Sequence, residues 1–555
     1  MTSDLAQRWQ LRTPPAALAD RWRAAGLWND ETLGDLLDRH LRALPEQTVA
    51  VHSQLRPSRG TYADVSDEAR RLAAGLLARG IGPGDVVAAQ LPNWREAAAT
   101  IYGAALLGAV VVPIVHFYGR REVDYILERT GVRGLVTTAR FGRLELLADA
   151  ADRPALRGLD VLAVVGDDVP AGAIGYDALL ADAPWTGRAD VDPDDPAVVA
   201  YTSGTTAEPK GVVHTHRTMG AEIRQIAPML PPRPPRLTTS PIGHVGGMLT
   251  GLFTPLLHGL PINLIDVWDT DRVMALMLAE GISAGSGATF FLTSLLDHPG
   301  LKAEHRALMP YMSMGGAAVP EAIARRAAAA GLCLTRNYGS TEHPTTTGAR
   351  PTDPEEGRLT TDGRALDGVE LRLVDDDGND VGPGEPGEIL SRGPDLFVGY
   401  TDPALTATVL DADGWYASGD IGVLDAHGYL TITDRKKDVI IRGGENISAA
   451  EVEEVLARLP EVAEVAVVGA PDAKYGEHAC AVIRLRDASS TLDLAAVRAA
   501  TEASGLGRQK WPEELRLVED FPRTASGKIR KRDLRASLRS ATPSARPHNR
   551  RSSPR

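Results

Sequence analysis

Residues Tyr201–Gly211 read YTSGTTAEPKG and directly follow the apolar run Ala197–Ala200. The apolar run predicts a buried strand. In the loop that follows, Thr202–Thr206 supply hydroxyls and unhindered backbone N–H groups, and Lys210 adds a positive charge, a combination that can surround a phosphate chain. The loop is not a Walker loop, because that motif ends in Gly-Lys-Ser/Thr and the order here is Pro-Lys-Gly. The stretch therefore predicts a polyphosphate-binding loop after a strand of an α/β domain.

The chain before this loop alternates strand-like and helical patterns. Asp67–Arg79 repeats apolar residues three and four apart and ends before a glycine, which predicts an amphipathic helix. Val86–Leu91 predicts a strand and Ala97–Leu107 a second helix. Val110–Val115 is continuously apolar, which is typical of a strand covered on both faces. This alternation predicts an α/β fold with largely parallel sheets up to about residue 430.

The pattern changes twice toward the C-terminus. Gly, Pro and Asp cluster in Asp375–Glu388 between alternating segments, which predicts a small antiparallel unit. From Lys437 onward the chain predicts a compact α+β domain, with strands at Val439–Ile441, Val465–Val468 and Cys480–Leu485 and helices at Ala449–Arg458 and Leu494–Ser504. The expected organisation is an N-terminal domain over 1–434 with a β-rich subdomain over about 360–434, a hinge at 435–437, a mobile C-terminal domain over 438–540 and a disordered basic tail at 541–555.

Composition limits the classes of function. Acidic residues outnumber basic ones, 73 to 60, so the net charge of −13 repels polyanions and disfavours nucleic acid as a partner. The two cysteines, Cys333 and Cys480, are too few for a disulfide framework or a four-cysteine zinc site. The N-terminus has no secretory pattern, and Gly103–Val115, the longest apolar stretch, is shorter than the roughly 20 residues of a membrane helix. A cytoplasmic protein with no transmembrane segment is the expectation.

Five further strings follow the phosphate loop in order: Gly315–Pro320 (GGAAVP), Asn337–Glu342 (NYGSTE), Trp415–Asp420 (WYASGD), Asp434–Asp438 (DRKKD) and Pro522–Ile529 (PRTASGKI). Together with the loop they resemble the motifs of adenylate-forming enzymes, the superfamily of acyl-CoA synthetases, firefly luciferases and adenylation domains of peptide synthetases. The resemblance runs from about Gly60 to Arg532 and is strongest to CoA ligases of fatty, alicyclic or aromatic acids. It implies a large α/β domain followed by a small mobile α+β domain.

The resemblance also implies roles in nucleotide binding. In the family, an aromatic residue at Tyr338 packs on adenine, Thr341 contacts the α-phosphate and Glu342 holds Mg²⁺, a hard cation that prefers carboxylate oxygen. Asp420 accepts hydrogen bonds from both ribose hydroxyls, and Arg435 lies near the ribose and phosphates. The implied ATP- and AMP-binding residues are Thr202, Ser203, Gly204, Thr205, Thr206, Gly315, Gly316, Ala317, Asn337, Tyr338, Gly339, Asp420 and Arg435. One departure is Ala207, where the commonest phosphate loop has glycine.

For catalysis, the resemblance implies that Lys528 neutralises charge on the carboxylate and α-phosphate in the transition state. Lys437 is the implied pivot of the C-terminal domain. Gly443 and Gly444 line the implied CoA tunnel, where glycine lets the backbone pass close to a narrow group; a plain turn is the open alternative. The implied catalytic residues are Lys528, His244, Thr341, Glu342 and Lys210.

The segment Pro241–Gly247 (PIGHVGG) resembles the stretch whose histidine, here His244, separates the acyl pocket from the thiol tunnel. Peptide-synthetase domains carry an acidic residue near the position of Val245 to pair with an amino group. A buried ammonium without that partner is costly, which favours an apolar carboxylic acid over an α-amino acid. The residues around the expected pocket are small or apolar, so the acid could be medium-chain, alicyclic or aromatic. The expected acyl-pocket residues are Val245, Gly246, Gly247 and Thr289.

The predicted function is an AMP-forming acid–thiol ligase that uses ATP, Mg²⁺ and CoA. Alternatives stay open: the acyl group could pass to a carrier-protein thiol, an amine or another small nucleophile, or the chain could be a non-catalytic member of the same fold. A non-catalytic member would have no reason to keep the full set of expected site residues, which are Lys210, Glu342, Asp420, Arg435 and Lys528. A homodimer is left open.

Overall fold

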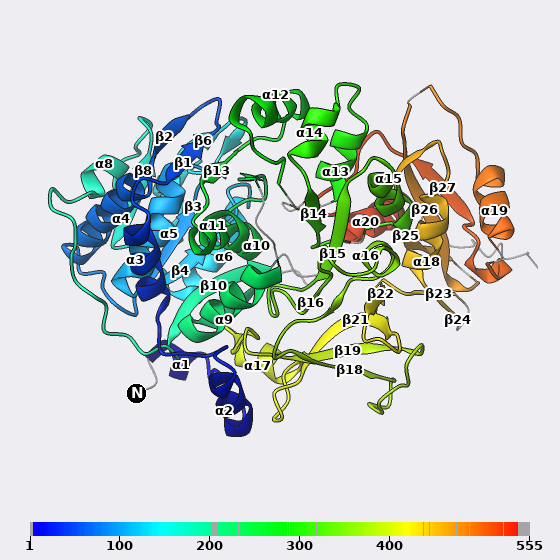
Figure 1. Cartoon of the computed structure of the whole chain (residues 1–555), viewed down its shortest axis with the longest axis horizontal. Coiled ribbons are helices and arrows are strands. Elements are labelled where there is room, and N and C mark those ends of the chain that lie inside the picture. The colour runs from blue at the N-terminus through cyan, green and yellow to red at the C-terminus, as the bar shows by residue number, and fades with distance from the viewer. Residues whose placement is uncertain are drawn as a thin grey trace, which may run out of the picture. The chain divides into compact units, whose positions relative to one another are not determined.

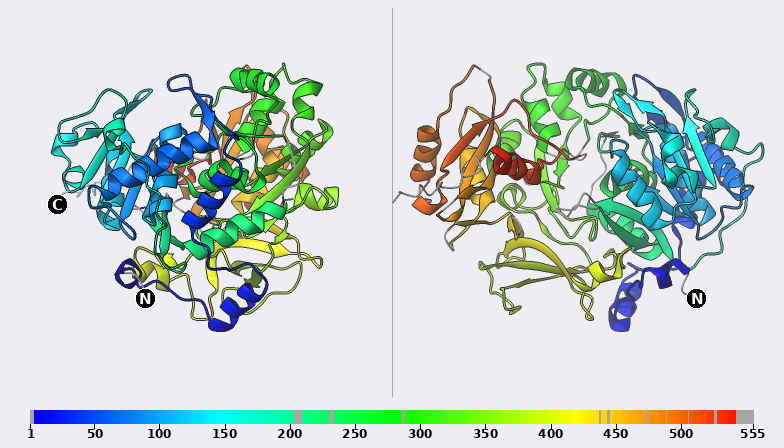
Figure 2. Two further views of the ribbon diagram at one scale, coloured as in Figure 1. Left: turned by 60° about the vertical axis from the view of Figure 1, so that its left-hand side comes forward. Right: turned by 180° about the vertical axis from the view of Figure 1, so that it is seen from behind.

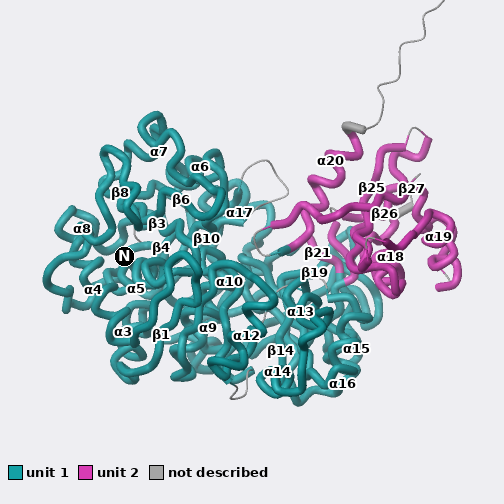
Figure 3. The backbone as a smooth tube through the Cα atoms, turned by 90° about the horizontal axis from the view of Figure 1, so that it is seen from above, with its two compact units in different colours: residues 1–418, 422–432, 525–527 teal, residues 419–421, 433–524, 528–555 magenta. Residues whose placement is uncertain are grey.

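The computed structural model in Figure 1 describes residues 4–202, 209–229, 234–285, 287, 289–317, 319–436, 438–442, 445–472, 474–487, 489–504, 506–524 and 527–541. The chain forms two compact units (Figure 3). Unit 1 comprises Met1–Ser418, Gly422–Ile432 and Ala525–Gly527, and unit 2 comprises Gly419–Ile421, Thr433–Thr524 and Lys528–Arg555. Among the described helices, none is long and apolar enough to cross a membrane.

The largest sheet of unit 1 has eight strands in the order β20-β11-β10-β4-β3-β5-β8-β9. The strands are β20 (Gly399–Tyr400), β11 (Lys210–Thr215), β10 (Pro196–Thr202), β4 (Val110–Pro113), β3 (Val86–Gln90), β5 (Gly134–Thr138), β8 (Val161–Val165) and β9 (Ile174–Gly175). Neighbours from β10 to β9 pair in parallel, whereas β11 is antiparallel to both of its neighbours. The predicted α/β fold with a largely parallel sheet is confirmed.

Helices cover both faces of this sheet, which explains its continuously apolar strands. Alternate residues of β3 enter different cores: Val87 belongs to one cluster and Val86 to the other. Helices of the first cluster are α3 (Leu33–Ala43), α4 (Tyr62–Leu77) and α5 (Arg95–Leu107), and α6 (Arg120–Thr130) contributes to the second. Helix α5 packs so closely on α4 that a Cβ at Gly103 would lie 2.5 Å from the Ala69 carbonyl oxygen. Figure 2 shows the blue and cyan elements of this domain from two further sides.

Smaller sheets complete unit 1. One has the order β14-β15-β16-β17, with β14 (Tyr311–Met314), β15 (Cys333–Tyr338), β16 (Thr347–Gly348) and β17 (Arg364–Ala365). Another has the order β12-β13-β1-β2, with β12 (Leu237–Thr238), β13 (Ile262–Leu264), β1 (Thr48–Val51) and β2 (Ser58–Thr61). Strands β18 (Glu370–Val374) and β19 (Pro386–Arg392) pair antiparallel on either side of the Gly/Pro/Asp cluster, as predicted. The same sheet includes β21 (Tyr416–Leu424) and β22 (Leu430–Arg435), of which residues 419–421 and 433–435 are counted in unit 2.

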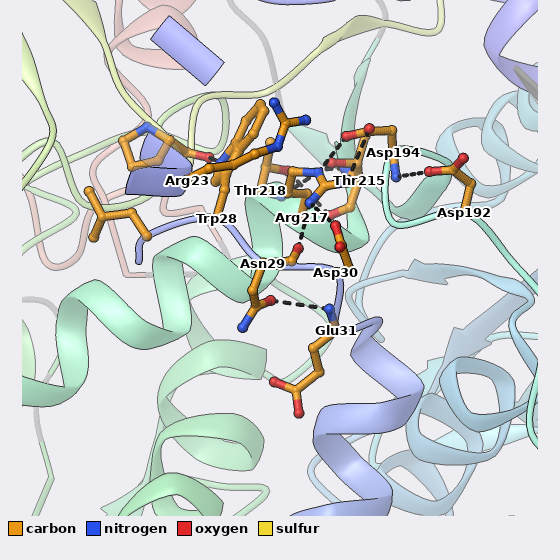
Figure 4. A network of polar contacts seen from close by, with 12 residues as sticks. Arg23, Trp28, Asn29, Asp30, Glu31, Asp192, Asp194, Thr215, Arg217 and Thr218 are labelled. Atoms are coloured by element: carbon orange, nitrogen blue, oxygen red, sulfur yellow. Dashed lines mark hydrogen bonds and ion pairs between the residues drawn. The ribbon is translucent and has the colours of Figure 1, made fainter. Parts of the chain in front are cut away.

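Helix α9 (His216–Ile226) directly follows β11, and a network at its start ties it to the N-terminal segment (Figure 4). Thr215 caps the helix by accepting a hydrogen bond from the Thr218 N–H. The buried Arg217 guanidinium donates to Asp194 Oδ1 at 2.7 Å and to the Asn29 carbonyl oxygen at 2.5 Å. It also lies 5.4 Å from the centre of the Trp28 ring.

Two tryptophans extend this attachment toward distant parts of unit 1. Trp22 Nε1 donates to the Gly368 carbonyl oxygen at 3.2 Å, and Trp28 Nε1 donates to the Pro394 carbonyl oxygen at 2.7 Å. Both rings are buried. The N-terminal segment is therefore an integral layer of unit 1 rather than an appended arm.

Unit 2 contains a five-stranded sheet with the path β24-β23-β26-β25 and β27 paired to β26. Its strands are β23 (Ile440–Arg442), β24 (Glu445–Ile447), β25 (Val462–Asp472), β26 (Gly476–Leu485) and β27 (Glu514–Leu517), and its helices include α18 (Ala449–Leu456), α19 (Leu494–Ala503) and α20 (Lys531–Ala541). Strand β25 is longer than the predicted Val465–Val468, because it pairs with β26 along its whole length. The predicted hinge residue Lys437 and residues 542–555 of the predicted tail lie outside the described residues.

Candidate active site

A tyrosine brings two predicted site residues of unit 1 together. Lys210 is the first residue of β11, and the pairing Val212↔Tyr400 places β20 beside that strand. Lys210 Nζ lies 5.0 Å from the centre of the Tyr400 ring, and the Tyr400 hydroxyl donates to Glu342 Oε1 at 2.7 Å. The phosphate-loop lysine and the predicted magnesium ligand thus share one partner. Sequence reasoning missed Tyr400, which sits in a two-residue strand with no pattern to single it out.

The Glu342 end of this arrangement is shielded from solvent. Glu342 is 8% exposed and Tyr400 1% exposed. Burial, together with the negative charge of Glu342, raises the pKa of Tyr400, so its hydroxyl keeps its proton and acts as the donor. The Glu342 carbonyl oxygen accepts a hydrogen bond from the Phe397 N–H at 2.8 Å. Both the main chain and the side chain of Glu342 are therefore held.

The loop after β15 has a defined shape. His214 Nε2 donates to the Thr341 carbonyl oxygen at 2.8 Å. Burial lowers the pKa of His214 to about 4, so the ring is neutral near pH 7. At Gly339 a Cβ would lie 2.0 Å from the Pro344 carbonyl oxygen, so the turn has no room for a side chain. The predicted residues Gly339, Thr341 and Glu342 thus lie in one tightly packed loop.

The predicted adenine segments lie at the carboxyl ends of two neighbouring parallel strands. Strand β14 pairs with β15 through Met314↔Arg336. Gly315 follows β14, and a Cβ there would lie 2.5 Å from the Asn337 side chain. Asn337 Oδ1 accepts a hydrogen bond from Ser313 Oγ at 3.1 Å. Ligands of α/β sheets bind outside the carboxyl ends of the strands, so the placement of Gly315, Gly316, Ala317, Asn337 and Tyr338 is consistent with a nucleotide site.

A buried asparagine holds the predicted acyl-pocket segment. Asn93 Oδ1 accepts a hydrogen bond from the Ile242 N–H at 2.8 Å, and its Nδ2 donates to the carbonyl oxygens of Ser240 and Ile265, both at 3.0 Å. His244 caps the short helix α10 (Val245–Met248), where its Nδ1 accepts from the Gly246 N–H at 3.2 Å.

Close backbone packing explains one glycine of this segment and leaves room at another. A Cβ at Gly247 would lie 2.0 Å from the Pro241 carbonyl oxygen. At Gly246 the nearest atom to a Cβ is His244 Nδ1, at 3.6 Å. Val245 is buried, and Thr289 begins helix α13 (Thr289–Leu296). Sequence reasoning did not identify Asn93, although its amide joins this segment at Ile242 to the carbonyl oxygens of Ser240 and Ile265.

Other predicted residues lie in unit 2. Arg435 Nε donates to Asp420 Oδ1 at 2.5 Å, and Asp420 is 6% exposed. The exposed Lys528 sits in a turn whose backbone is held by two hydrogen bonds with Thr524: the Thr524 N–H donates to the Lys528 carbonyl oxygen at 2.7 Å, and the Lys528 N–H donates to Thr524 Oγ1 at 3.1 Å. The predicted residues that lie outside the described part of the chain are Ser203, Gly204, Thr205, Thr206, Lys437, Gly443 and Gly444.

The donor set fits magnesium that arrives with a nucleotide. Within the described part of the chain, no group of three or more His, Cys, Asp or Glu residues could hold a metal ion. Mg²⁺ commonly binds through one or two carboxylates together with substrate phosphates and waters, rather than in an all-protein cage. A single carboxylate at Glu342, with the Lys210 amino group near the ring of Tyr400, matches that mode.

Known proteins resemble this chain over most of its length. The family model described as "AMP-binding enzyme" matches residues 37–401, and "AMP-binding enzyme C-terminal domain" matches residues 451–528. The medium-chain fatty-acid–CoA ligase of Escherichia coli (strain K12) is 34% identical over 534 residues, which cover 93% of this chain and 92% of that protein. The indoleacetate–CoA ligase of Aromatoleum aromaticum is 33% identical, with 91% of this chain and 97% of that protein covered.

Solved structures extend the comparison. The anthranilate CoA ligase AuaEII, in complex with anthranoyl-AMP, matches with a TM-score of 0.83 and 25% identity, covering 92% of this chain and 98% of that one. The amide bond synthetase McbA of Marinactinospora thermotolerans matches with a TM-score of 0.80 and 28% identity, covering 91% and 100%. The fold and these matches define an adenylate-forming enzyme. The chain belongs to the AMP-binding enzyme family, which confirms the resemblance stated from its motifs.

Proposed function

We propose that this protein is an AMP-forming carboxylic acid–CoA ligase whose reaction begins at the site around Lys210, Tyr400 and Glu342. The observation that carries the proposal is that Tyr400 joins the phosphate-loop lysine to the carboxylate expected to hold Mg²⁺. The relatives that are named CoA ligases and match over nine-tenths of the chain support the activity.

In the first half-reaction, a carboxylate oxygen of the substrate forms a bond to the α-phosphorus of ATP, and the bond from that phosphorus to the pyrophosphate oxygen breaks. Lys210 and Lys528 contribute positive charge while negative charge spreads over the phosphate oxygens. Mg²⁺ would add charge neutralisation at the phosphates beside Glu342. Asp420, whose Oδ1 is bonded to Arg435, is the proposed acceptor for the ribose hydroxyls.

In the second half-reaction, the sulfur of CoA forms a bond to the acyl carbon, the carbon–oxygen bond to AMP breaks, and the thiol proton is released. His244, the N-cap residue of α10, is proposed to form the wall between the acyl group and the thiol. Gly443 and Gly444 are proposed to line the CoA tunnel. The proposed acid is apolar, either medium-chain, alicyclic or aromatic, because Val245 offers no charge to an ammonium group.

A second candidate keeps the first half-reaction and changes the acceptor to an amine. The structural similarity to an enzyme titled an amide bond synthetase supports keeping it. The names of the sequence relatives favour CoA. A cytoplasmic location stays a prediction that rests on the two unpaired cysteines, Cys333 and Cys480, and a homodimer stays open.

The test is AMP release from Mg-ATP across a panel of carboxylic acids, with and without CoA, with products identified by mass spectrometry. A CoA-dependent thioester mass supports the ligase and identifies the acid. Formation of the acyl adenylate without any effect of CoA would move the acceptor to an amine or a carrier-protein thiol.

Lys528→Ala and Gly443→Leu separate the two half-reactions. We expect Lys528→Ala to abolish adenylation and to spare thioester formation from supplied acyl adenylate, because the lysine charge is needed only at the phosphorus. Gly443→Leu should do the reverse by blocking the CoA tunnel. Equal loss of both half-reactions in the lysine variant would contradict the division of roles.

A further inference from the structure

Behind the loop that carries Thr341 and Glu342 lies a buried acidic pair that the proposed reaction does not use. Glu222 belongs to α9 and is 1% exposed, and Asp395 lies between β19 and β20 and is 0% exposed. His343, also 1% exposed, directly follows Glu342 in the loop. All three residues belong to unit 1. Buried carboxyl groups are costly unless each is hydrogen-bonded or paired, so this cluster requires an explanation.

One oxygen of each carboxyl group is held by the loop. Thr345 Oγ1 donates to Glu222 Oε1 at 2.6 Å. His343 Nε2 lies 3.2 Å from Asp395 Oδ1, and Ser391 Oγ lies 2.8 Å from His343 Nδ1. With Ser391 donating to Nδ1, the Nε2–H of His343 points at Asp395 Oδ1. Two side chains of the loop therefore contact the two acids.

The second oxygen of each acid has no hydrogen-bond partner among the described residues. Glu222 Oε2 and Asp395 Oδ2 are both buried, and the described residues offer neither of them a hydrogen-bond donor. The Glu222 carboxyl group has the Asp395 carboxyl group as an electrostatic and hydrogen-bonding neighbour, and the Thr345 N–H is a further donor to it. Two ionised carboxylates in contact repel strongly, whereas one proton between them satisfies both oxygens. Burial and the negative charge of Asp395 raise the pKa of Glu222, which favours a proton held between the two acids.

We propose that Glu222 and Asp395 share one proton and that this acid pair is the positioning device for the loop carrying Thr341 and Glu342. The pair acts through Thr345 and His343 and does not touch the nucleotide. Because α9 directly follows β11, the pair links the strand that begins with Lys210 to the loop that holds Glu342. The kinetic test of this inference, the KM for Mg-ATP, rests on the proposed function. The spectroscopic test, the infrared band of a protonated carboxyl group, rests on the side-chain contacts alone.

Substitution by glutamine and by leucine separates a shared proton from simple space filling. In Glu222→Gln the amide group donates to Asp395 and its oxygen accepts from Thr345, so both contacts survive without a carboxyl proton. In Glu222→Leu the Thr345 hydroxyl and Asp395 Oδ2 are left unpaired. We expect the glutamine variant to keep the KM for Mg-ATP within about threefold and the leucine variant to raise it at least about tenfold, the range for unsatisfied buried polar groups.

The matched control lies on the same helix. Gln225 is 4% exposed and its Nε2 donates to the Asp367 carbonyl oxygen at 2.7 Å, so Gln225→Leu also removes a buried hydrogen bond of α9. It has no contact to the Thr345 or His343 side chain among the described hydrogen bonds. We expect this variant to lower the melting temperature without shifting the KM for Mg-ATP.

The full-length chain and its three variants are compared by steady-state AMP release, thermal melting and infrared difference spectra without substrate. The expected result is a protonated-carboxyl band present in the wild type and absent from Glu222→Gln, with the KM raised only by leucine. Loss of function in the glutamine variant equal to that in the leucine variant overturns the shared proton. An unchanged KM in the leucine variant, or an equal shift in Gln225→Leu, overturns the positioning role.

Two arms keep the test decisive. If Glu222→Leu does not fold, Asp395→Asn replaces it: its amide donates to Glu222 and lets that group ionise, so the carboxyl band must disappear, and its persistence would refute the pair. If none of the acids in the panel leads the wild type to release AMP, the proposed function fails. The infrared measurement still decides whether the proton is shared.

Discussion

Replacing Tyr400 with phenylalanine removes a single oxygen from the centre of the site. The hydroxyl that donates to Glu342 Oε1 at 2.7 Å is lost. The ring stays between β11 and the loop, so Lys210 keeps its position 5.0 Å from the ring centre. The variant therefore tests whether the orientation of the Glu342 carboxylate, rather than the packing of the ring, supports the reaction.

The magnitude follows from the kind of bond. A hydrogen bond to a charged group contributes about 1.5–3 kcal/mol, and 1.4 kcal/mol corresponds to a tenfold change in an equilibrium constant. Loss of the Tyr400 hydroxyl should therefore weaken productive Mg-ATP binding by about 10- to 150-fold. Because Glu342 is only 8% exposed, water can replace little of the lost donor, and the upper half of that range is expected.

The assay is ATP–pyrophosphate exchange as a function of Mg²⁺ concentration, with Tyr102→Phe as the control. Tyr102 is fully buried and its hydroxyl donates to the Leu252 carbonyl oxygen at 2.8 Å, so that variant also loses a buried tyrosine hydrogen bond, one that involves neither Lys210 nor Glu342. We expect Tyr102→Phe to lower the melting temperature alone and Tyr400→Phe to raise the required Mg²⁺ concentration. An equal effect of the two variants on the Mg²⁺ dependence would refute the role given to Tyr400.

Two further predictions concern stability. Arg217→Met should lower the free energy of unfolding of unit 1 by about 1.5–3 kcal/mol, because the bonds of a 5%-exposed guanidinium to Asp194 and Asn29 are lost; thermal melting and proteolysis of the N-terminal segment measure it, and an unchanged melting temperature would contradict it. His116, whose pKa is lowered by burial from 6.5 to about 4, takes up its proton first in the unfolded chain, so its contribution is complete above about pH 6.5 and is lost as the pH falls toward 4. Between pH 6.5 and 5.5 the stability of His116→Phe should fall by about 1 kcal/mol less than that of the wild type in denaturant titrations, and parallel pH profiles would show that the buried ring does not titrate in this way.

Local pattern was enough to predict the elements that surround the site. The predicted helix Ala97–Leu107 agrees with α5 (Arg95–Leu107), and the predicted strand Val86–Leu91 agrees with β3 (Val86–Gln90). These segments carry their own signal, because an apolar run or a helical repeat is contained within the element. The strings that carry Lys210 and the expected adenine segments were also visible in the sequence, since each is continuous; the roles given to them stay predictions.

The partners of those motifs were not predictable, because they depend on which distant elements become neighbours. Tyr400 meets Glu342 only because the two-residue strand β20 joins the edge of the sheet beside β11. Glu222 looked like any polar residue of an amphipathic helix until the packing of α9 buried it against Asp395. Asn93 likewise acquires its role from backbone groups of Ser240, Ile242 and Ile265 that the sequence does not place beside it.

The N-terminal layer, which includes Trp22 and Trp28, can be attached only after the residues that bind it have been synthesised. Trp28 is separated by 366 residues from Pro394, whose carbonyl oxygen it binds. At about 5–20 residues per second, a ribosome needs roughly 20–70 s to make that intervening chain. During this interval the rings of Trp22 and Trp28 lack the backbone acceptors that hold them in the finished protein. The N-terminal layer is thus made well before the residues that hold it, and it is among the last parts of unit 1 to be locked in place.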